Sequence, residues 1–253
     1  MLFVSLTLII TATYYVAVTQ ISARGQLLDF YGAKQSMIGL ENTISNVIWS
    51  PGASQVYFLN DFGGNFNVTP TTNTLLINIT NNTSTDTIFN SPVGQAVYEL
   101  AIAEPGSSGF YFDGDARTIV NSSTSTMTQL EIVTGETSQE IVLSYRPLAS
   151  SIVTGSSGDK PVNTVRIYVI SMNLSHSLAL PSGFYLKAKC VSVVSELAKN
   201  CTLSPLVSIL QVNAVLNGAN GDVSLPIHSN SSLGAILNVE LLVCNIQLQT
   251  VKV

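Results

Sequence analysis

The chain has 253 residues and a net charge of -5, and only 10% of its residues are charged, whereas roughly 25% is usual for a soluble globular domain. The acidic balance argues against nucleic-acid binding, the 46% hydrophobic content excludes a disordered chain, and three cysteines exclude a small disulfide scaffold. Uncharged polar residues replace the missing charge, with 31 Ser, 23 Thr and 20 Asn. Such a surface suits a protein that is glycosylated, assembled, or both.

The N-terminal segment, residues 1–23, contains no charged side chain, and the first one is Arg24. As a helix it would be about 35 Å long, enough to cross a bilayer. A secretory signal peptide would need a basic start, which is missing. Against a permanent membrane anchor, the Ser, Thr, Tyr and Gln side chains make the segment more polar than a typical span. A third interpretation is a mature end left after removal of a leader. The apolar residues expected to be buried between copies of the chain are Leu2, Phe3, Val4, Leu6, Leu8, Ile9, Ile10, Val16, Val18 and Ile21.

An apolar stripe continues beyond this segment with alternating spacings of three and four residues. This pattern predicts an amphipathic helix. We expect it to extend the contact between copies, so that Phe30, Met37, Leu40 and Ile44 belong to the filament core; the alternative is a core helix on its own domain. The sequence Trp49-Ser50-Pro51-Gly52 then stops the helix, because Ser50 precedes a proline. We therefore expect one helical unit over residues 1–50. The stripe consists of Phe30, Ala33, Met37, Leu40, Ile44 and Val47.

The remainder, residues 51–253, alternates short β-prone runs with Gly-, Ser- and Asn-rich turns. Runs such as 55–59 and 140–145 are separated by turns such as 60–64 and 217–222. Many short strands with such turns indicate an antiparallel sandwich. The predicted fold class is α+β, with a long N-terminal hydrophobic and amphipathic helix followed by a large antiparallel β-sandwich-like domain. A division of this domain near residues 155–161 is only weakly indicated.

Eight N-glycosylation sequons occur, more than this composition gives by chance, and all lie in the β region. Each sequon alone is a weak signal, but most border predicted turns, where a bulky glycan can face solvent. The alternative is a Thr- and Asn-rich β surface without sugars. The candidate sites are Asn67, Asn78, Asn81, Asn82, Asn121, Asn173, Asn200 and Asn230.

The cysteines offer one candidate disulfide. Cys190 and Cys201 have ten residues between them and could close a loop if the strands bring their Cα atoms within about 7 Å. Cys244 is then left over, as a small buried hydrophobe. Since the chain has no Cys-x-x-Cys and only two histidines, we expect no metal site.

Catalytic patterns are nearly absent. His176 and His228 lie in loop-like contexts, and there is no Gly-x-Ser-x-Gly nucleophile motif. Asp113-Gly114-Asp115 could bind Ca²⁺ through its carboxylates but is better interpreted as a polar turn. We therefore expect no enzymatic activity and no cofactor.

The order of these segments resembles a mature archaeal pilin of the type IV pilin-like superfamily, to which archaellins also belong. The resemblance covers about residues 1–70, where residues 40–52 lead into Val56-Tyr57-Phe58-Leu59 and Gly63-Gly64. It implies that a class III signal peptide is removed, that the helix is stored in the membrane, and that assembly moves it into a filament core with glycosylated domains outside. The chain lacks the acidic residue near position 5 of bacterial type IV pilins, as archaeal members generally do, and its β domain is large.

The resulting expectation is a structural subunit of an extracellular cell-surface filament used in adhesion or attachment. Its partners would be copies of itself, the membrane before assembly, and N-linked glycans, without nucleic acid. A non-closing contact between copies generates such a helical polymer. Three alternatives remain: a membrane-anchored accessory pilin-like binding protein, a donor-strand polymer using the β-prone run 11–19, and a secreted hydrolase.

Overall fold

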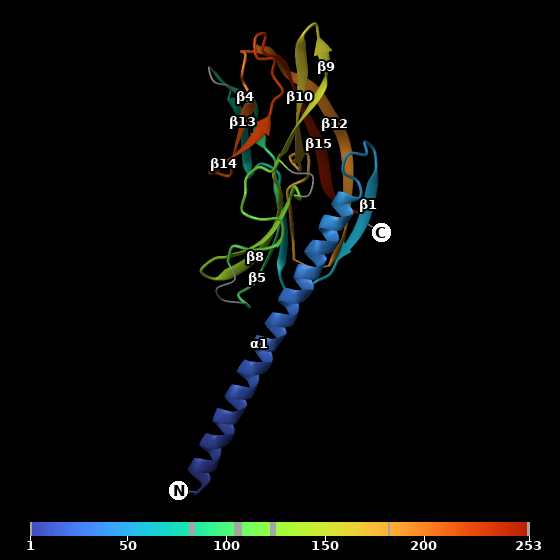
Figure 1. Cartoon of the computed structure of the whole chain (residues 1–253). Helices are drawn as coiled ribbons and strands as arrows, with labels where there is room; N and C mark the ends of the chain where they lie inside the picture. The colour runs from blue at the N-terminus through green and yellow to red at the C-terminus, as the bar shows by residue number, and fades with distance from the viewer. Residues whose placement is uncertain (1, 81–83, 104–107, 122–124, 182, 252–253) are drawn as a thin grey trace.

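The computed structural model describes residues 2–80, 84–103, 108–121, 125–181 and 183–251, with side chains from residue 3 onward. Helix α1 (Leu2–Ser45) is followed by a β domain, so the predicted α+β fold class is confirmed. Figure 1 shows that the N-terminal half of α1 projects away from the β domain, whereas its C-terminal half lies against it. One helix is thus divided into a docked half and an exposed half.

Helix α1 ends at Ser45, a few residues before the predicted stop at Trp49-Ser50-Pro51-Gly52. After Ser45 the chain makes a turn in which the Ile48 N–H still donates to the Ile44 carbonyl, at 3.0 Å. Trp49 then adopts a left-handed conformation, with φ 62°, which is unusual for a bulky residue. Its ring is held edge-on against Tyr168 at 5.5 Å between centroids. The packed Trp49 side chain and the following Pro51 therefore redirect the chain after the turn that ends the helix.

Three sheets make up the described part of the β domain. The long sheet A has the order β1-β12-β15-β10-β9. Its strands β10 and β15 run parallel, whereas every other strand pair among the described residues is antiparallel. Its members are β1 (Ser54–Leu59), β12 (Phe184–Leu203), β15 (Ala235–Val251), β10 (Lys160–Ser171) and β9 (Leu148–Ser157).

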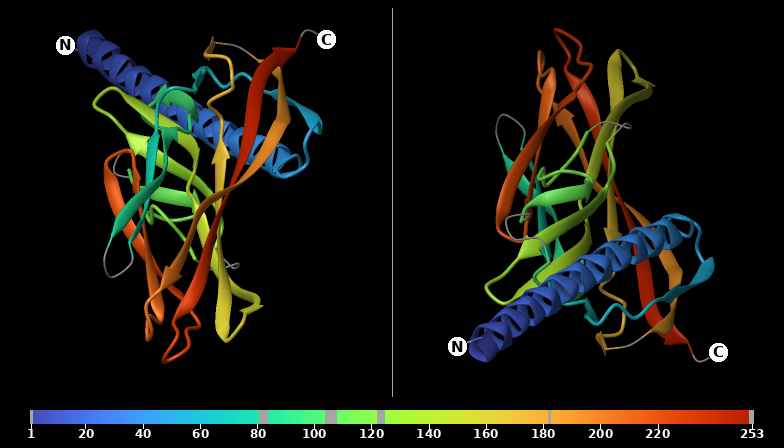
Figure 2. Two further views of the ribbon diagram at one scale, coloured as in Figure 1. Left: turned by 90° about the horizontal axis from the view of Figure 1, so that it is seen from above. Right: turned by 90° about the horizontal axis from the view of Figure 1, so that it is seen from below.

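Sheet B, of order β11-β2-β5-β8-β7-β6, and sheet C, of order β14-β13-β3-β4, complete the domain. Sheet B comprises β11 (Leu178–Leu180), β2 (Asn65–Thr69), β5 (Gln95–Ala101), β8 (Ser138–Tyr145), β7 (Thr128–Thr134) and β6 (Phe110–Asp113). Sheet C comprises β14 (Ala219–Pro226), β13 (Ile209–Leu216), β3 (Thr74–Thr80) and β4 (Thr85–Pro92). Figure 2 shows α1 crossing one side of this assembly, with its N-terminal end beyond the strands.

Two hydrophobic cores lie along sheet A. The first, which we call the helix core, joins the C-terminal half of α1 to sheet B and to one end of β10, β12 and β15. The second, which we call the distal core, joins sheet C to the other parts of the same three strands. Residues 155–161, where a domain division was weakly indicated, are instead the β9–β10 hairpin, in which Ser157 pairs with Lys160.

Candidate functional site: an exposed apolar helix

The C-terminal half of α1 belongs to the core of its own domain. The predicted stripe from Phe30 to Val47 is buried, with no member more than 3% exposed. Glycines bring the helix close to the strands, since a Cβ added at Gly32 would lie 2.2 Å from the Phe62 ring and one at Gly39 would lie 2.3 Å from the Tyr57 hydroxyl. The helix and β1 therefore pack as one unit.

This packing corrects part of the predicted filament-core set. Four of its members are buried inside the chain's own helix core and have no surface left for a neighbouring copy: Phe30, Met37, Leu40 and Ile44. The stripe was thus correctly identified as buried, but for its C-terminal part the alternative of a core helix on its own domain applies. The sequence alone could not separate the two, because the same spacing serves both kinds of contact.

The N-terminal half of α1 is exposed on all sides. Every side chain from Phe3 to Arg24 is exposed, and the apolar ones range from 47% for Val18 to 85% for Phe3. This stretch is apolar and long enough to span a membrane, by length and composition only. The predicted residues of this half that are exposed are Phe3, Val4, Leu6, Leu8, Ile9, Ile10, Val16, Val18 and Ile21. The side chain of Leu2 lies outside the described residues.

Threonine hydroxyls in this half are satisfied within the helix. The hydroxyls of Thr7, Thr11 and Thr13 donate to the backbone carbonyl four residues earlier, each at 2.8 Å, and Thr19 donates likewise to Tyr15. A hydroxyl bonded in this way can enter an apolar environment without losing a hydrogen bond. The threonines that make the segment polar in composition therefore do not oppose its burial.

Charged side chains on the docked half of α1 are bound to the β domain. The Lys34 ammonium lies 4.1 Å from the centroid of the Phe112 ring, a cation–π contact. The Glu41 carboxylate accepts from the Thr128 hydroxyl at 3.0 Å and from Ser45 at 2.6 Å. These contacts fix the rotation of the helix about its axis, and so fix how the exposed half leaves the domain.

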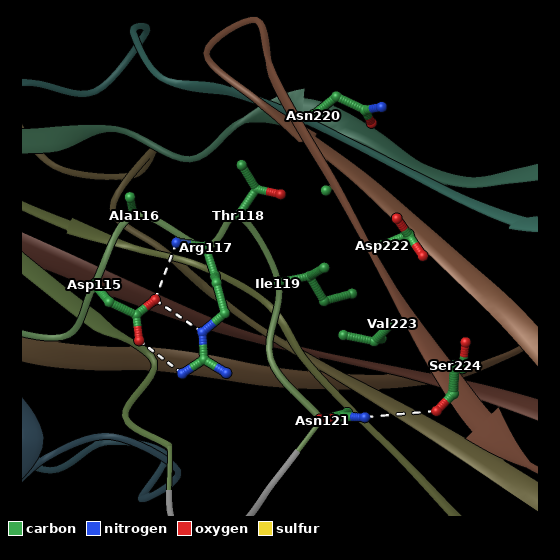
Figure 3. Close-up of a pocket in the computed structure, with 11 residues that line it drawn as sticks. Asp115, Ala116, Arg117, Thr118, Ile119, Asn121, Asn220, Asp222, Val223 and Ser224 are labelled. Atoms are coloured by element: carbon green, nitrogen blue, oxygen red, sulfur yellow. Dashed lines mark hydrogen bonds and ion pairs between the residues drawn. The ribbon is translucent and has the colours of Figure 1, made fainter.

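A polar groove of about 670 Å³ lies between residues 115–121 and β14. In Figure 3, Asp115 and Arg117 form one wall, and Asp222 and Ser224 of β14 lie on the other. Asp115 forms ion pairs with Arg117, at 2.6 Å, and with Arg146. These two guanidinium groups lower the pKa of the Asp115 carboxyl, so it is an ionised structural partner of the arginines.

The candidate Ca²⁺ motif forms a turn, as favoured. Gly114 has φ 81°, and a Cβ there would lie 2.2 Å from the Thr128 carbonyl oxygen, so the turn requires glycine. Among the residues that the structure describes, no group of three or more His, Cys, Asp or Glu is placed to hold a metal ion. The two histidines are exposed on different segments: His176 follows β10, and His228 follows β14.

The candidate glycosylation sites differ in exposure. Asn121 and Asn200 are exposed, with amide hydrogen bonds to Ser224 and Asn238, respectively. Asn173 is half-buried, and its side-chain oxygen is buried without a hydrogen-bond partner. The other half-buried sites are Asn67, Asn78 and Asn230. The remaining two sites, Asn81 and Asn82, lie outside the described residues.

The expected Cys190–Cys201 disulfide is wrong. Both residues lie on β12, and an extended strand separates residues 190 and 201 by about 35 Å, far beyond the reach of a disulfide. Instead, the Cys190 sulfur lies 3.6 Å from that of Cys244 on β15. Proximity in sequence misled the prediction. The period-two apolar pattern around Cys190 and around Cys244 was the available signal that both face one core.

Comparison with known proteins finds no match: no family model, no curated protein and no solved structure corresponds to this chain.

Proposed function

We propose that this chain is the structural subunit of an extracellular helical filament, in which residues 2–23 of α1 form the shared core and the β domains lie outside. The observation that carries the proposal is the exposed, apolar and uncharged segment of residues 3–23. It continues without a break into a half of α1 whose apolar stripe is buried in the β domain. A water-exposed surface of this kind is unfavourable. Because it is exposed all round, several neighbours are needed to cover it.

The available energy supports a polymer held by these helices. Each large apolar side chain that becomes buried contributes about 1.5–3 kcal/mol. Association costs an estimated 4–15 kcal/mol in lost freedom of motion. Burial of the nine predicted residues from Phe3 to Ile21 would contribute about 14–27 kcal/mol, which matches or exceeds that cost. The contact uses the whole circumference of the helix rather than one self-complementary patch, which favours a heterologous, open helical arrangement.

The resemblance of residues 1–70 to archaeal type IV pilin-like proteins supports the same proposal. It adds a sequence of events: storage of the helix in the membrane, transfer to the filament, and display of a glycosylated β domain at the cell surface. The internally bonded threonines fit both environments, because lipid and a helix bundle are equally apolar. Adhesion or surface attachment is the role proposed for the filament.

A second candidate is a membrane-anchored accessory pilin-like protein that stays monomeric. The same observation favours it, since the exposed helix is long and apolar enough to remain in a bilayer. A donor-strand polymer has less support, because residues 2–45 form one continuous helix. The three arrangements differ in what covers the N-terminal segment. Other helices cover it in a filament core, lipid covers it in an anchored protein, and the sheet of a neighbouring copy covers it in a donor-strand polymer.

The test compares two aspartate variants at isoleucines of similar exposure. Ile9 on α1 is 61% exposed and Ile209 on β13 is 53% exposed. We expect Ile9→Asp to abolish filaments seen by electron microscopy of the expressing cells, because a buried charge in the helix bundle is strongly unfavourable. The Ile209→Asp control should form normal filaments, and both chains should keep the β-rich circular dichroism spectrum of the wild type in detergent.

Normal filaments from Ile9→Asp would overturn the proposed core. Absence of wild-type filaments, with the chain remaining in the membrane fraction, would favour the anchored accessory protein. Helical density for residues 3–45 in wild-type filaments would exclude the donor-strand arrangement.

A further inference from the structure

Two buried thiols face each other at the base of α1. Cys190 on β12 and Cys244 on β15 are both 0% exposed, and their sulfur atoms lie 3.6 Å apart. Both belong to the helix core. They are 54 positions apart in the chain, so their meeting is a product of the fold.

A bulge in the strand pairing lies beside this contact. Cys190 is in register with Ile246, whereas Cys244 is in register with Val193, and the register shifts between Cys190 and Ser192. In a regular ladder the two cysteines would be diagonal neighbours about 7–8 Å apart. The extra residue, Val191, makes a bulge here; bulges bend a strand and re-aim its side chains, and the two sulfurs lie 3.6 Å apart.

The same pair lies under the joint between helix and sheet. The Trp49 N–H contacts the Cys244 sulfur at 3.5 Å. The backbone of Cys190 exchanges two hydrogen bonds with the segment that follows the helix: Gly52 N–H donates to its carbonyl at 2.8 Å, and its own N–H donates to Ala53 at 3.0 Å. A covalent link here would therefore fix β12, β15 and the end of α1 relative to one another.

We propose that Cys190 and Cys244 form a structural disulfide that joins β12 to β15 beneath the helix–sheet joint. The oxidant is the disulfide of a thiol–disulfide exchange partner, either a protein or a small molecule. One cysteine thiolate attacks that disulfide and forms a mixed disulfide, and the second cysteine displaces it. The two S–H bonds are replaced by one Sγ–Sγ bond, and the partner leaves as two thiols with the two electrons and two protons.

This oxidation takes place before the helix core closes. In the folded chain both sulfurs are buried, and burial raises the pKa of the Cys244 thiol to about 12, so that little reactive thiolate is present. Cys201, which is half-buried elsewhere on β12, stays a free thiol. The inference needs an oxidising compartment but holds whether or not the chain forms filaments.

The test is a peptide map of the full-length chain in detergent, refolded with oxidised and reduced glutathione and then alkylated. Cleavage after Glu196 and Glu240 places the three cysteines in three separate peptides. We expect the peptides of Cys190 and Cys244 to be linked, with a mass two hydrogen atoms below the sum of the two reduced peptides. The Cys201 peptide should be alkylated. Three alkylated thiols, or a link to Cys201, would overturn the proposal.

A stability measurement with matched variants gives an independent answer. We expect refolding with excess dithiothreitol to lower the Tm of the wild type and of Cys201→Ala by about 5–15 °C, because the open chain regains entropy. The Tm of Cys190→Ala should not respond to the reductant. Equal responses of Cys190→Ala and Cys201→Ala would contradict the assignment, and if Cys190→Ala does not fold, the wild-type peptide map decides.

Discussion

At the scale of single residues, the most constrained charged group is Arg146. Its side chain is 1% exposed, and its guanidinium donates to the Thr126 carbonyl at 3.1 Å and to the Arg117 carbonyl at 3.0 Å. Asp115 supplies the compensating negative charge. A buried cation that loses its carboxylate partner is strongly destabilising, so these two residues hold the loop of residues 113–121 against sheet B.

We predict that Asp115→Asn lowers the free energy of unfolding by about 1–3 kcal/mol, less than for a fully buried pair because the Asp115 side chain is 42% exposed. The matched control is Asp222→Asn, across the same groove, which should change stability little. Chemical denaturation of both variants in detergent measures the difference. Equal losses in the two variants would show that Arg146 does not depend on Asp115.

The ion pairs of Asp115 with Arg117 and Arg146 also predict that the stability of the fold depends on pH. The two arginines lower the folded-state pKa of Asp115 below its ordinary value of 3.8. The contribution of the ionised Asp115 carboxylate to folding stability is therefore complete above pH 3.8 and is lost as the pH falls below 3.8. Between pH 7 and pH about 3, the wild type should lose more stability than Asp115→Asn, as followed by the Tm at each pH.

At the scale of elements, α1 contains two kinds of glycine. Gly39 faces Tyr57 so closely that an added Cβ would overlap the phenol ring, whereas a Cβ at Gly25 would have no atom within 4 Å. Both are helical, so alanine favours the helix at either site by about 1 kcal/mol. The two positions therefore separate helix propensity from helix docking within one element.

We predict that Gly39→Ala lowers the free energy of unfolding by about 1–3 kcal/mol, because overpacking moves Tyr57 away from its site. Gly25→Ala should leave it unchanged or raise it by up to about 1 kcal/mol. Thermal unfolding of the two variants in detergent compares them. A stabilising effect of Gly39→Ala would mean that helix and β1 are less closely packed than the structure shows.

The elements of this fold were largely predictable, because local patterns determine them. The missing charge before Arg24, the stripe from Phe30 and the stop at Trp49-Ser50-Pro51 give the bounds of α1 within a few residues. What sequence could not give is which partner covers the stripe, since periodicity identifies a buried face but not the surface against it. The parallel β10–β15 pair and the Cys190–Cys244 contact arise from long-range topology and were missed for that reason.

At the scale of the whole molecule, the change from exposed to buried residues along α1 falls between residues 24 and 30. It therefore lies inside the segment 1–50 that the sequence suggested as a separate unit. Residues 30–47 are as much part of the β domain as its strands are. The boundary between the exposed segment and the folded domain therefore lies at residues 24–30, and not at the end of the helix.

We predict that a chain starting at residue 24 is a folded, water-soluble monomer, since it loses the exposed apolar residues from Phe3 to Ile21 and keeps the helix core. A chain starting at residue 53 should aggregate or lose fixed tertiary structure, because it exposes the sheet surfaces that the stripe covers. Size-exclusion chromatography and near-ultraviolet circular dichroism distinguish the two. A well-folded monomer from residue 53 would show that the docked half of α1 is dispensable for the β domain.

The continuity of α1 has a consequence for the geometry of the proposed filament. The helix passes from its exposed to its docked half without a break, and the docked half is fixed by Gly32, Gly39 and Lys34. A rotation of the exposed half about its axis must therefore turn the β domain through a similar angle. Helix packing at the filament axis would therefore set the direction in which each β domain faces outward. Bending of the filament would require the helices to slide past one another.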